Sequence, residues 1–146
     1  MVTRLPTISP SAIVTPVRRV FKTRTFARWS RKAPLPDASL CKAVAEMRAG
    51  LIDADLGGGV YKKRVPMPGR GKSGGARTIL GSNLGDRWFF LFGFEKNDRA
   101  TIDARELAAL QKLAEALLAM GSTVLDRSVT AGELTEICHE KKPPVK

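Results

Sequence analysis

The chain of 146 residues contains one histidine and two cysteines, too few for most metal or triad chemistry. A metal hydrolase needs a cluster of histidine, cysteine or carboxylate ligands, and a catalytic triad needs a positioned histidine. His139 stands among polar residues near the C-terminus, where we predict a solvated side chain rather than a general base. Cys41 and Cys138 are far apart in the sequence and show no metal-type spacing. We therefore predict two free thiols, no metal and no cofactor.

Long apolar runs and secretory signals are also missing. No stretch approaches the ~18 apolar residues that span a bilayer, and no charged start leads into an apolar core. We therefore expect a cytoplasmic protein with no membrane contact. Residues 1–16 contain three prolines and show no apolar periodicity, so we predict a disordered N-terminal extension. An organelle transit peptide is the other interpretation of this acid-free stretch.

Acidic residues are scarce beside basic ones. Asp and Glu number 14 against 25 Lys and Arg, which gives a formal net charge of +11. This excess is too large to serve solubility alone and predicts a polyanionic partner: nucleic acid, an anionic membrane surface or an acidic protein. The 43% of apolar residues suffice for one modest core. We predict a single domain over residues 17–137 and a flexible basic tail over residues 138–146.

Apolar periodicity and capping residues predict an α+β fold. Alternation predicts four strands, over residues 17–23, 60–65, 76–82 and 87–94. Helical spacing predicts a short helix capped by Thr25, a helix capped by Asp37, a helix capped by Asp103 and Glu106, and a weaker helix over residues 123–131. This order predicts a mostly antiparallel sheet of about four strands, with two N-terminal helices and a C-terminal helix packed on one face.

The segment from Leu56 to Gly85 contains no Asp or Glu but nine of the 13 glycines. It holds six cations: Lys62, Lys63, Arg64, Arg70, Lys72 and Arg77. Glycine permits close approach of the backbone and exposes N–H groups, so the combination suits phosphate oxygens. A mobile, solvated hairpin loop is the alternative. A nucleotide-binding P-loop is excluded, because position 66 is proline where glycine is needed and a strand is predicted where a helix must follow.

Most of the few aromatic residues lie in one predicted strand. Trp88, Phe90, Phe92 and Phe94 alternate, so we expect them on one face. An open face of this kind would stack nucleobases, but the predicted helices would cover it, which favours core packing. Directly after this strand, Lys96 and Arg99 add two further cations.

Four stretches of the sequence carry a resemblance to a known family: residues 23–29, 50–64, 70–78 and 93–100. In this order they resemble the RelE/HigB-like toxins of type II toxin–antitoxin modules, which belong to the RelE/ParE superfamily. The similarity runs from about Val20 to Ile137 and implies a RelE-like fold. It does not include residues 1–16, so we expect the native chain to start further downstream.

The resemblance also implies an activity and partners. Toxins of this kind are metal-independent endoribonucleases that cleave mRNA in the ribosomal A site, which inhibits translation and arrests growth. The ribose 2′-hydroxyl attacks its neighbouring phosphate and leaves a cyclic phosphate and a 5′-hydroxyl. A cognate antitoxin, in this branch usually a helix-turn-helix DNA-binding protein, neutralises the toxin. Contact with DNA is therefore expected only through the antitoxin complex.

The same motifs imply site residues. The implied catalytic cations are Lys62, Arg64, Arg77, Lys96 and Arg99. Arg77 is expected to clamp the phosphate, because an arginine fork holds two oxygens as the transition-state charge develops. Lys62 is the candidate proton acceptor, and Lys96 or Arg99 would stabilise the leaving oxygen. The implied contacts to the flanking RNA backbone are Lys63, Arg70 and Lys72.

Two other functions remain open at this stage. A ParE-like poison would share the fold but inhibit DNA gyrase by protein contact, and a simple RNA-binding module would share the phosphate contacts. Some relatives carry a tyrosine after the last strand that stacks on a base, whereas this chain has alanine, threonine and isoleucine at positions 100–102. Cations on consecutive strands favour the nuclease, because a gyrase inhibitor has no phosphodiester to stabilise.

Overall fold

The computed structural model describes residues 18–67, 75–96, 99 and 101–139. The elements in these ranges are β1 (Arg19–Thr23), α2 (Arg24–Lys32), α3 (Asp37–Arg48), β2 (Ala54–Gly57), β3 (Val60–Val65), β4 (Ala76–Ser82), β5 (Arg87–Glu95), α4 (Ala104–Leu118), α5 (Ser122–Thr130) and β6 (Leu134–Ile137). The predicted α+β class is confirmed. Within the described ranges no helix combines the length and apolarity needed to cross a membrane.

One mixed sheet of six strands organises the described residues, in the order β2-β3-β4-β5-β1-β6. Every neighbouring pair is antiparallel except β1 and β5, which run parallel. The prediction of a mostly antiparallel sheet is therefore confirmed, but the predicted number of strands is too low. The two missed strands, β2 and β6, are four residues long each, which is too short for a clear alternation of apolar and polar side chains.

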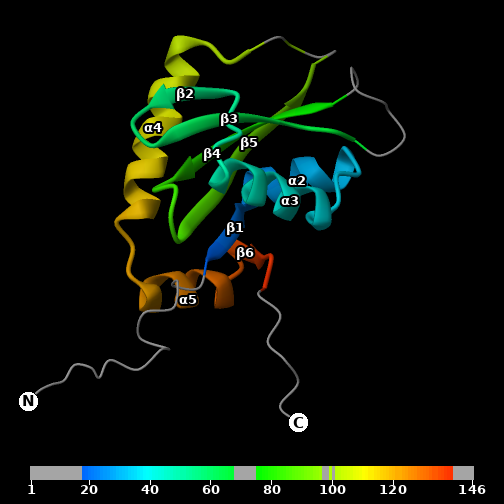
Figure 1. The fold of residues 1–146 in the computed structure, drawn as a ribbon. Coiled ribbons are helices and arrows are strands. Elements are labelled where there is room, and N and C mark those ends of the chain that lie inside the picture. The colour runs from blue at the N-terminus through cyan, green and yellow to red at the C-terminus, as the bar shows by residue number, and fades with distance from the viewer. Residues whose placement is uncertain (1–17, 68–74, 97–98, 100, 140–146) are drawn as a thin grey trace, which may run out of the picture.

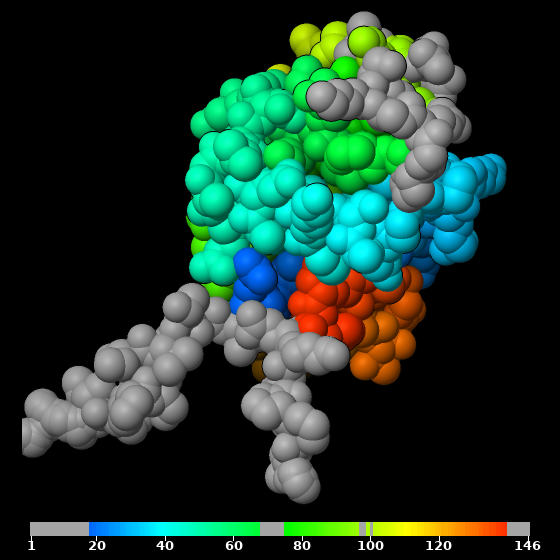
Figure 2. Space-filling view, turned by 45° about the vertical axis from the view of Figure 1, so that its right-hand side comes forward, coloured from blue at the N-terminus to red at the C-terminus, as the bar shows by residue number. Residues whose placement is uncertain are grey.

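Helices cover both faces of the sheet, so the prediction that they lie on one face is wrong (Figure 1). Helices α2 and α3 pack on one face through residues such as Phe26 and Leu40, and α4 packs on the other through Ala114 and Leu117. The face under α2 and α3 is called the α2/α3 face below, and the opposite one the α4 face. Figure 2 shows α2 and α3 side by side at the surface.

A break in the pairing of β4 with β5 explains why the aromatic residues divide between the two faces. Ile79 pairs with Phe92 but the next residue, Leu80, pairs with Phe90, so β5 holds one extra residue at this point. Such a bulge inverts the alternation beyond it. Trp88 and Phe90 therefore pack on the α2/α3 face, and Phe92 and Phe94 on the α4 face. The expected single aromatic face is wrong, whereas the expected core role is confirmed, because Trp88 and Phe90 are fully buried.

Of the three predicted helix caps, only that of α4 is confirmed; Asp37 is the first residue of α3, after Pro36 at the N-cap, and makes no cap bond. The capping box of Asp103 and Glu106 begins α4 as predicted. Helix α2 starts before Thr25, because the Thr23 hydroxyl oxygen accepts the N–H of Phe26 at 3.2 Å. The weaker helix predicted over residues 123–131 is present as α5.

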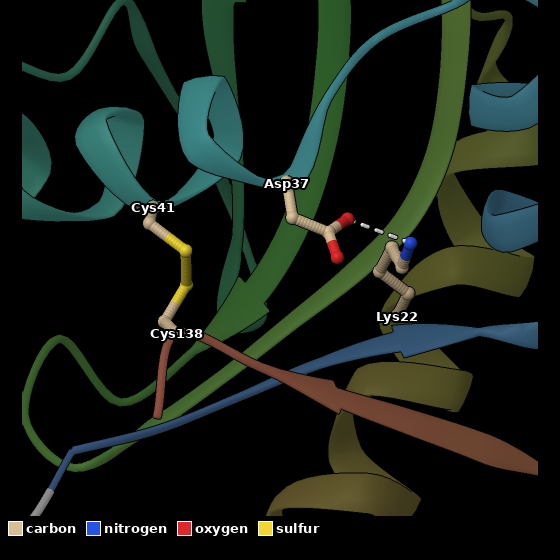
Figure 3. The surroundings of a disulfide bond; sticks show 4 residues. All are labelled: Lys22, Asp37, Cys41 and Cys138. Carbon is tan, nitrogen blue, oxygen red and sulfur yellow. Dashed lines mark hydrogen bonds and ion pairs between the residues drawn. A yellow bond between two sulfur atoms is a disulfide. The ribbon is translucent and has the colours of Figure 1, made fainter. Parts of the chain in front are cut away.

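Cys41 of α3 and Cys138, directly after β6, form a disulfide bond (Figure 3). The prediction of two free thiols is therefore wrong. The two cysteines are 97 residues apart, and they meet because β6 lies beside β1 and ends next to α3. An ion pair between Lys22 of β1 and Asp37 at the start of α3, 2.8 Å long, joins the same two parts of the fold (Figure 3).

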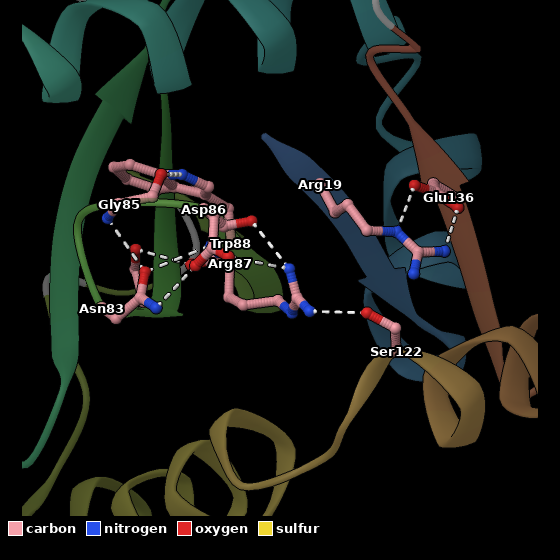
Figure 4. Close-up of polar contacts among 9 residues, drawn as sticks. Arg19, Asn83, Gly85, Asp86, Arg87, Trp88, Ser122 and Glu136 are labelled. Atoms are coloured by element: carbon pink, nitrogen blue, oxygen red, sulfur yellow. Dashed lines mark hydrogen bonds and ion pairs between the residues drawn. The ribbon is translucent and has the colours of Figure 1, made fainter. Parts of the chain in front are cut away.

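Two arginines on neighbouring strands also tie β6 and α5 to the sheet (Figure 4). Arg19 of β1 binds Glu136 at 2.8 Å and Asp126 at 2.9 Å. The hydrogen bond to Glu136 is the main reason that the pKa of Arg19 is raised. Arg87 of β5 donates to the Ser122 hydroxyl at the start of α5 at 3.1 Å. These arginines therefore serve the architecture rather than a ligand.

Candidate nucleic-acid interface

Three of the predicted catalytic cations share the α4 face of the sheet. Arg64 on β3 lies directly opposite Arg77 on β4, and Lys62 lies two residues before Arg64. Side chains two residues apart in a strand point the same way, and directly opposed residues have Cβ atoms about 5 Å apart. On its other side, Arg77 is paired with Phe94 of β5, which belongs to the core on the α4 face. The structure thus gathers Lys62, Arg64 and Arg77 on two adjacent strands, as the sequence predicted.

Nothing in the described part of the chain neutralises this group of cations. The ion pairs of the described residues do not include Lys62, Arg64 or Arg77. Like charges directly opposite each other on neighbouring strands destabilise a sheet. An anion bound between Arg64 and Arg77 would turn this repulsion into attraction.

Arg77 has an unsatisfied hydrogen-bond donor. Its side chain is half-buried, and its Nη1 atom is the one buried side-chain nitrogen or oxygen of the described residues with no hydrogen-bond partner. Leaving such a donor unpaired costs roughly 1–3 kcal/mol, and more for a charged group. The fold therefore carries a cost at Arg77 that a phosphate oxygen would remove.

Lys63 lies on the opposite side of the strand, away from this group. Its ammonium Nζ donates to the Leu51 carbonyl oxygen at 2.9 Å and pairs with Glu46 of α3 at 3.0 Å, and its side chain is 8% exposed. The structure does not bring the predicted RNA contact Lys63 to the face that holds Lys62 and Arg64. Strand alternation puts Lys63 on the other side from Lys62 and Arg64, but three consecutive cations give no sign of which side faces the helix.

Arg99 borders the site but is held by a carboxylate. Its Nη1 donates to Glu106 Oε2 at 2.9 Å, its Nη2 bonds to Oε1 of the same residue, and its guanidinium lies 5.5 Å from the ring centre of Phe94 and 5.7 Å from that of Phe92. The bond to Glu106 is the main cause of the raised pKa of Arg99. Glu106 thus caps α4, as its position in the sequence predicted, and also holds Arg99, which the sequence did not indicate.

The other predicted cations fall in different places. Lys96 directly follows β5 and is exposed, with no ion pair among the described residues. Arg70 and Lys72 lie outside the described residues. At the edge of β3, the Asp53 carboxylate accepts the backbone N–H of Arg64, which fixes the strand where β2 stops pairing with it. The described site therefore consists of Lys62, Arg64 and Arg77, with Lys96 and Arg99 at its border.

Replacing Arg99 with glutamine is expected to raise the pKa of Glu106 toward its ordinary value. The hydrogen bond from Arg99 is the main cause of the lowered pKa of Glu106, and the N–H of Asp103 is the second, so the return is expected to be incomplete. A lowered carboxyl pKa means that the pair stabilises the fold at neutral pH and that this contribution is lost as the pH falls through the lowered value. NMR titration of the Glu106 carboxyl measures the change, with Arg105→Gln as the control. Equal pKa values in all three proteins would show that the pair does not form in solution.

Comparison with known proteins bears on what this arrangement of cations does. A family model described as "RelE toxin of RelE / RelB toxin-antitoxin system" matches residues 18–137. This span contains all the described elements, from β1 to β6. A search of curated proteins gives no match.

Proposed function

The chain belongs to the RelE toxin family, as its motifs predicted, and from this we propose that it is a ribosome-dependent endoribonuclease that cleaves mRNA without a metal. Membership implies a cognate antitoxin as partner. The observation that carries the proposal is the group of Lys62, Arg64 and Arg77, in which Arg77 keeps a buried, unpaired donor. A gyrase inhibitor that works by protein contact would have no use for that donor.

The proposed reaction is a transfer of phosphate between two ribose oxygens. The 2′-oxygen forms a bond to phosphorus as its proton leaves, and the bond from phosphorus to the 5′-oxygen of the next nucleotide breaks. Negative charge grows on the two non-bridging oxygens between these events. Arg77 would donate to them, because a guanidinium fork matches two oxygens and a preorganised donor costs no reorganisation. Arg64, directly opposite, would share this charge.

The remaining cations are assigned to the attacking 2′-hydroxyl and to the leaving 5′-oxygen. Lys62, in its uncharged amine form, is the proposed proton acceptor from the 2′-hydroxyl. Arg99 is engaged by Glu106 and can hardly give up a proton, so it would act through its charge and by its contact with Phe94. Lys96 is exposed and can donate a proton, which favours it as the group that protonates the leaving 5′-oxygen. Lys96 and Arg99, which the sequence treated as alternatives, therefore have different proposed roles.

Primer extension on a defined mRNA tests the proposal. Purified protein is added with and without ribosomes, and cuts are expected only when ribosomes are present. The downstream fragments should carry a 5′-hydroxyl, and chelation of divalent ions after ribosome assembly should not prevent the chemical step. If no cuts appear in either mixture while DNA gyrase stalls, the protein is a gyrase inhibitor of the same fold.

The proposal extends to the cell. A toxin that acts on translating ribosomes must work in the cytoplasm, and we expect its antitoxin to be a helix-turn-helix protein through which the pair binds DNA. Co-expression of the gene beside this one should relieve growth arrest, and the complex should bind its own promoter. A neighbour that lacks DNA-binding activity would contradict the expected type of antitoxin.

A further inference from the structure

Helix α2 carries a row of cations on its outer side, called the α2 ridge here. The ridge consists of four exposed side chains: Arg24, Arg28, Arg31 and Lys32. Phe26, Ala27 and Ser30 on the inner side are buried against the sheet. No Asp or Glu occurs anywhere in residues 1–36. The ridge is therefore a second basic surface in a second acid-free part of the sequence.

The fold itself does not explain this charge. The ion pairs of the described residues include none of the four side chains, and Arg24 alone among them donates to a described residue, the carbonyl oxygen of Gly132 at 3.3 Å. Arg31 and Lys32 in the last turn are favoured by the helix dipole, but Arg24 in the first turn is opposed by it. Cations four residues apart also repel each other. An external anion would offset both costs.

Helix α2, which carries the ridge, packs on one face of the sheet, and the proposed cleavage site lies on the other. The Trp29 ring of α2 sits so close to Gly93 of β5 that a Cβ at Gly93 would lie 2.3 Å from it. The next residue, Phe94, faces the other way and is the neighbour of Arg77. Figure 1 shows α2 on the side of the sheet away from α4. Arg24 lies at the margin of the sheet, where it lines a hollow with Phe92 of the α4 face. A single RNA strand held at Arg77 would have to pass around the sheet to reach the rest of the ridge, whereas a bulky partner can contact both.

The chemistry of the surface favours RNA over an acidic protein. Protein interfaces have an apolar centre, often with aromatic anchors. The large apolar side chains that are exposed in the described residues are Leu51, Leu84, Leu113 and Val124, and none of them lies on α2. Leu113 lines a hollow with Arg24 at one end of the ridge. Arg28, Arg31 and Lys32, within about 6 Å of one another along the helix axis, present spaced point charges without an apolar centre. Phosphate backbones are bound by charge in this way.

We propose that the α2 ridge docks the phosphate backbone of a folded, double-helical RNA. Ribosomal RNA is the source that the proposed function supplies, and the naming of the ribosome rests on that function. Docking through the ridge would leave Lys62, Arg64 and Arg77 on the other face to engage the mRNA. The ridge would then determine where the protein binds, and the cation group what it cuts.

Binding measured without cleavage tests the ridge separately from the nuclease. The double variant Arg28→Gln/Arg31→Gln is made in an Arg77→Ala background, and binding to purified ribosomes and to a short RNA duplex is measured over a series of salt concentrations. Lys112→Gln/Arg127→Gln, which removes two exposed charges from other helices, is the control. The ridge variant is expected to bind roughly tenfold more weakly at low salt, with a log–log salt dependence shallower by about 0.9 per lost contact.

The control decides between the ridge and net charge alone. Circular dichroism should show both double variants folded, because the substituted side chains are exposed. Equal weakening in the two variants would overturn the proposal, as would unchanged RNA binding accompanied by loss of the antitoxin complex, which would assign the ridge to an acidic protein. If the wild-type protein never cuts mRNA but the ridge variant loses duplex binding, the ridge stands and the nuclease proposal fails.

Discussion

Replacing Arg77 with alanine is expected to lower ribosome-dependent cleavage by a factor of about 10² to 10³ or more, the loss seen when a preorganised donor is removed from a developing oxyanion. The residue lies between Arg64 and Phe94 on the neighbouring strands, and its buried Nη1 has no hydrogen-bond partner. Cleavage rates measured on ribosome-bound mRNA test the prediction. An unchanged rate would show that the phosphate binds elsewhere.

The stability of the same variant gives a second readout. Removing a side chain with an unsatisfied buried donor and a like-charged neighbour is expected to leave the melting temperature unchanged or to raise it. Lysine at position 77 keeps a charge but loses the fork, so an intermediate rate is expected. Lys63→Ala is the matched control on the adjacent strand: it strips Glu46 of its partner and should destabilise the fold while sparing more of the activity. A marked loss of stability in Arg77→Ala would indicate a structural role.

Loss of the disulfide is expected to cause the largest change in stability. The bond closes a loop of 97 residues, and the chain-entropy relation gives about 4.7 kcal/mol for a loop of about 100 residues. We expect a decrease of about 3–4 kcal/mol in the free energy of unfolding, because denatured chains keep some residual structure. Guanidinium unfolding with and without a thiol reductant measures the decrease.

The variant Cys41→Ala/Cys138→Ala separates the bond from the reductant. It should unfold at the same denaturant concentration as the reduced wild-type protein and should not respond to reductant. Alkylation of the native protein before and after reduction counts the thiols directly. Two reactive thiols before reduction, together with identical unfolding curves, would show that the bond does not form in solution.

The sequence predicted the local parts of the fold well, because they depend on residues close together. Strands β3 and β4 have the bounds predicted from alternation, and Asp103 and Glu106 cap α4 as expected. The prediction of a single aromatic face failed because β5 holds one extra residue opposite Ile79 and Leu80, which reverses the side-chain directions beyond it. Composition carries no sign of a bulge of this kind.

The candidate site shows the same limit. The resemblance placed Lys62 and Arg64 on one strand and Arg77 on the next, and the pairing of these strands brings all three to one face. Lys63 points toward the α2/α3 face, where it pairs with Glu46 of α3. The pairing of Arg99 with Glu106 and that of the two cysteines likewise depend on contacts that only the assembled fold creates.

The place of β1 in the sheet bears on how the protein is made. Of the described strands β1 leaves the ribosome first, but its neighbours are β5 and β6, which follow roughly two-thirds and more than nine-tenths of the way along the chain. Contacts between such distant segments close long loops and form slowly. The stacked rings of Phe21 and Phe89, with centres 5.1 Å apart, can meet only when β5 has emerged. A nascent chain therefore holds Lys62, Arg64 and Arg77 on an incomplete sheet until β5 and β6 have been synthesised.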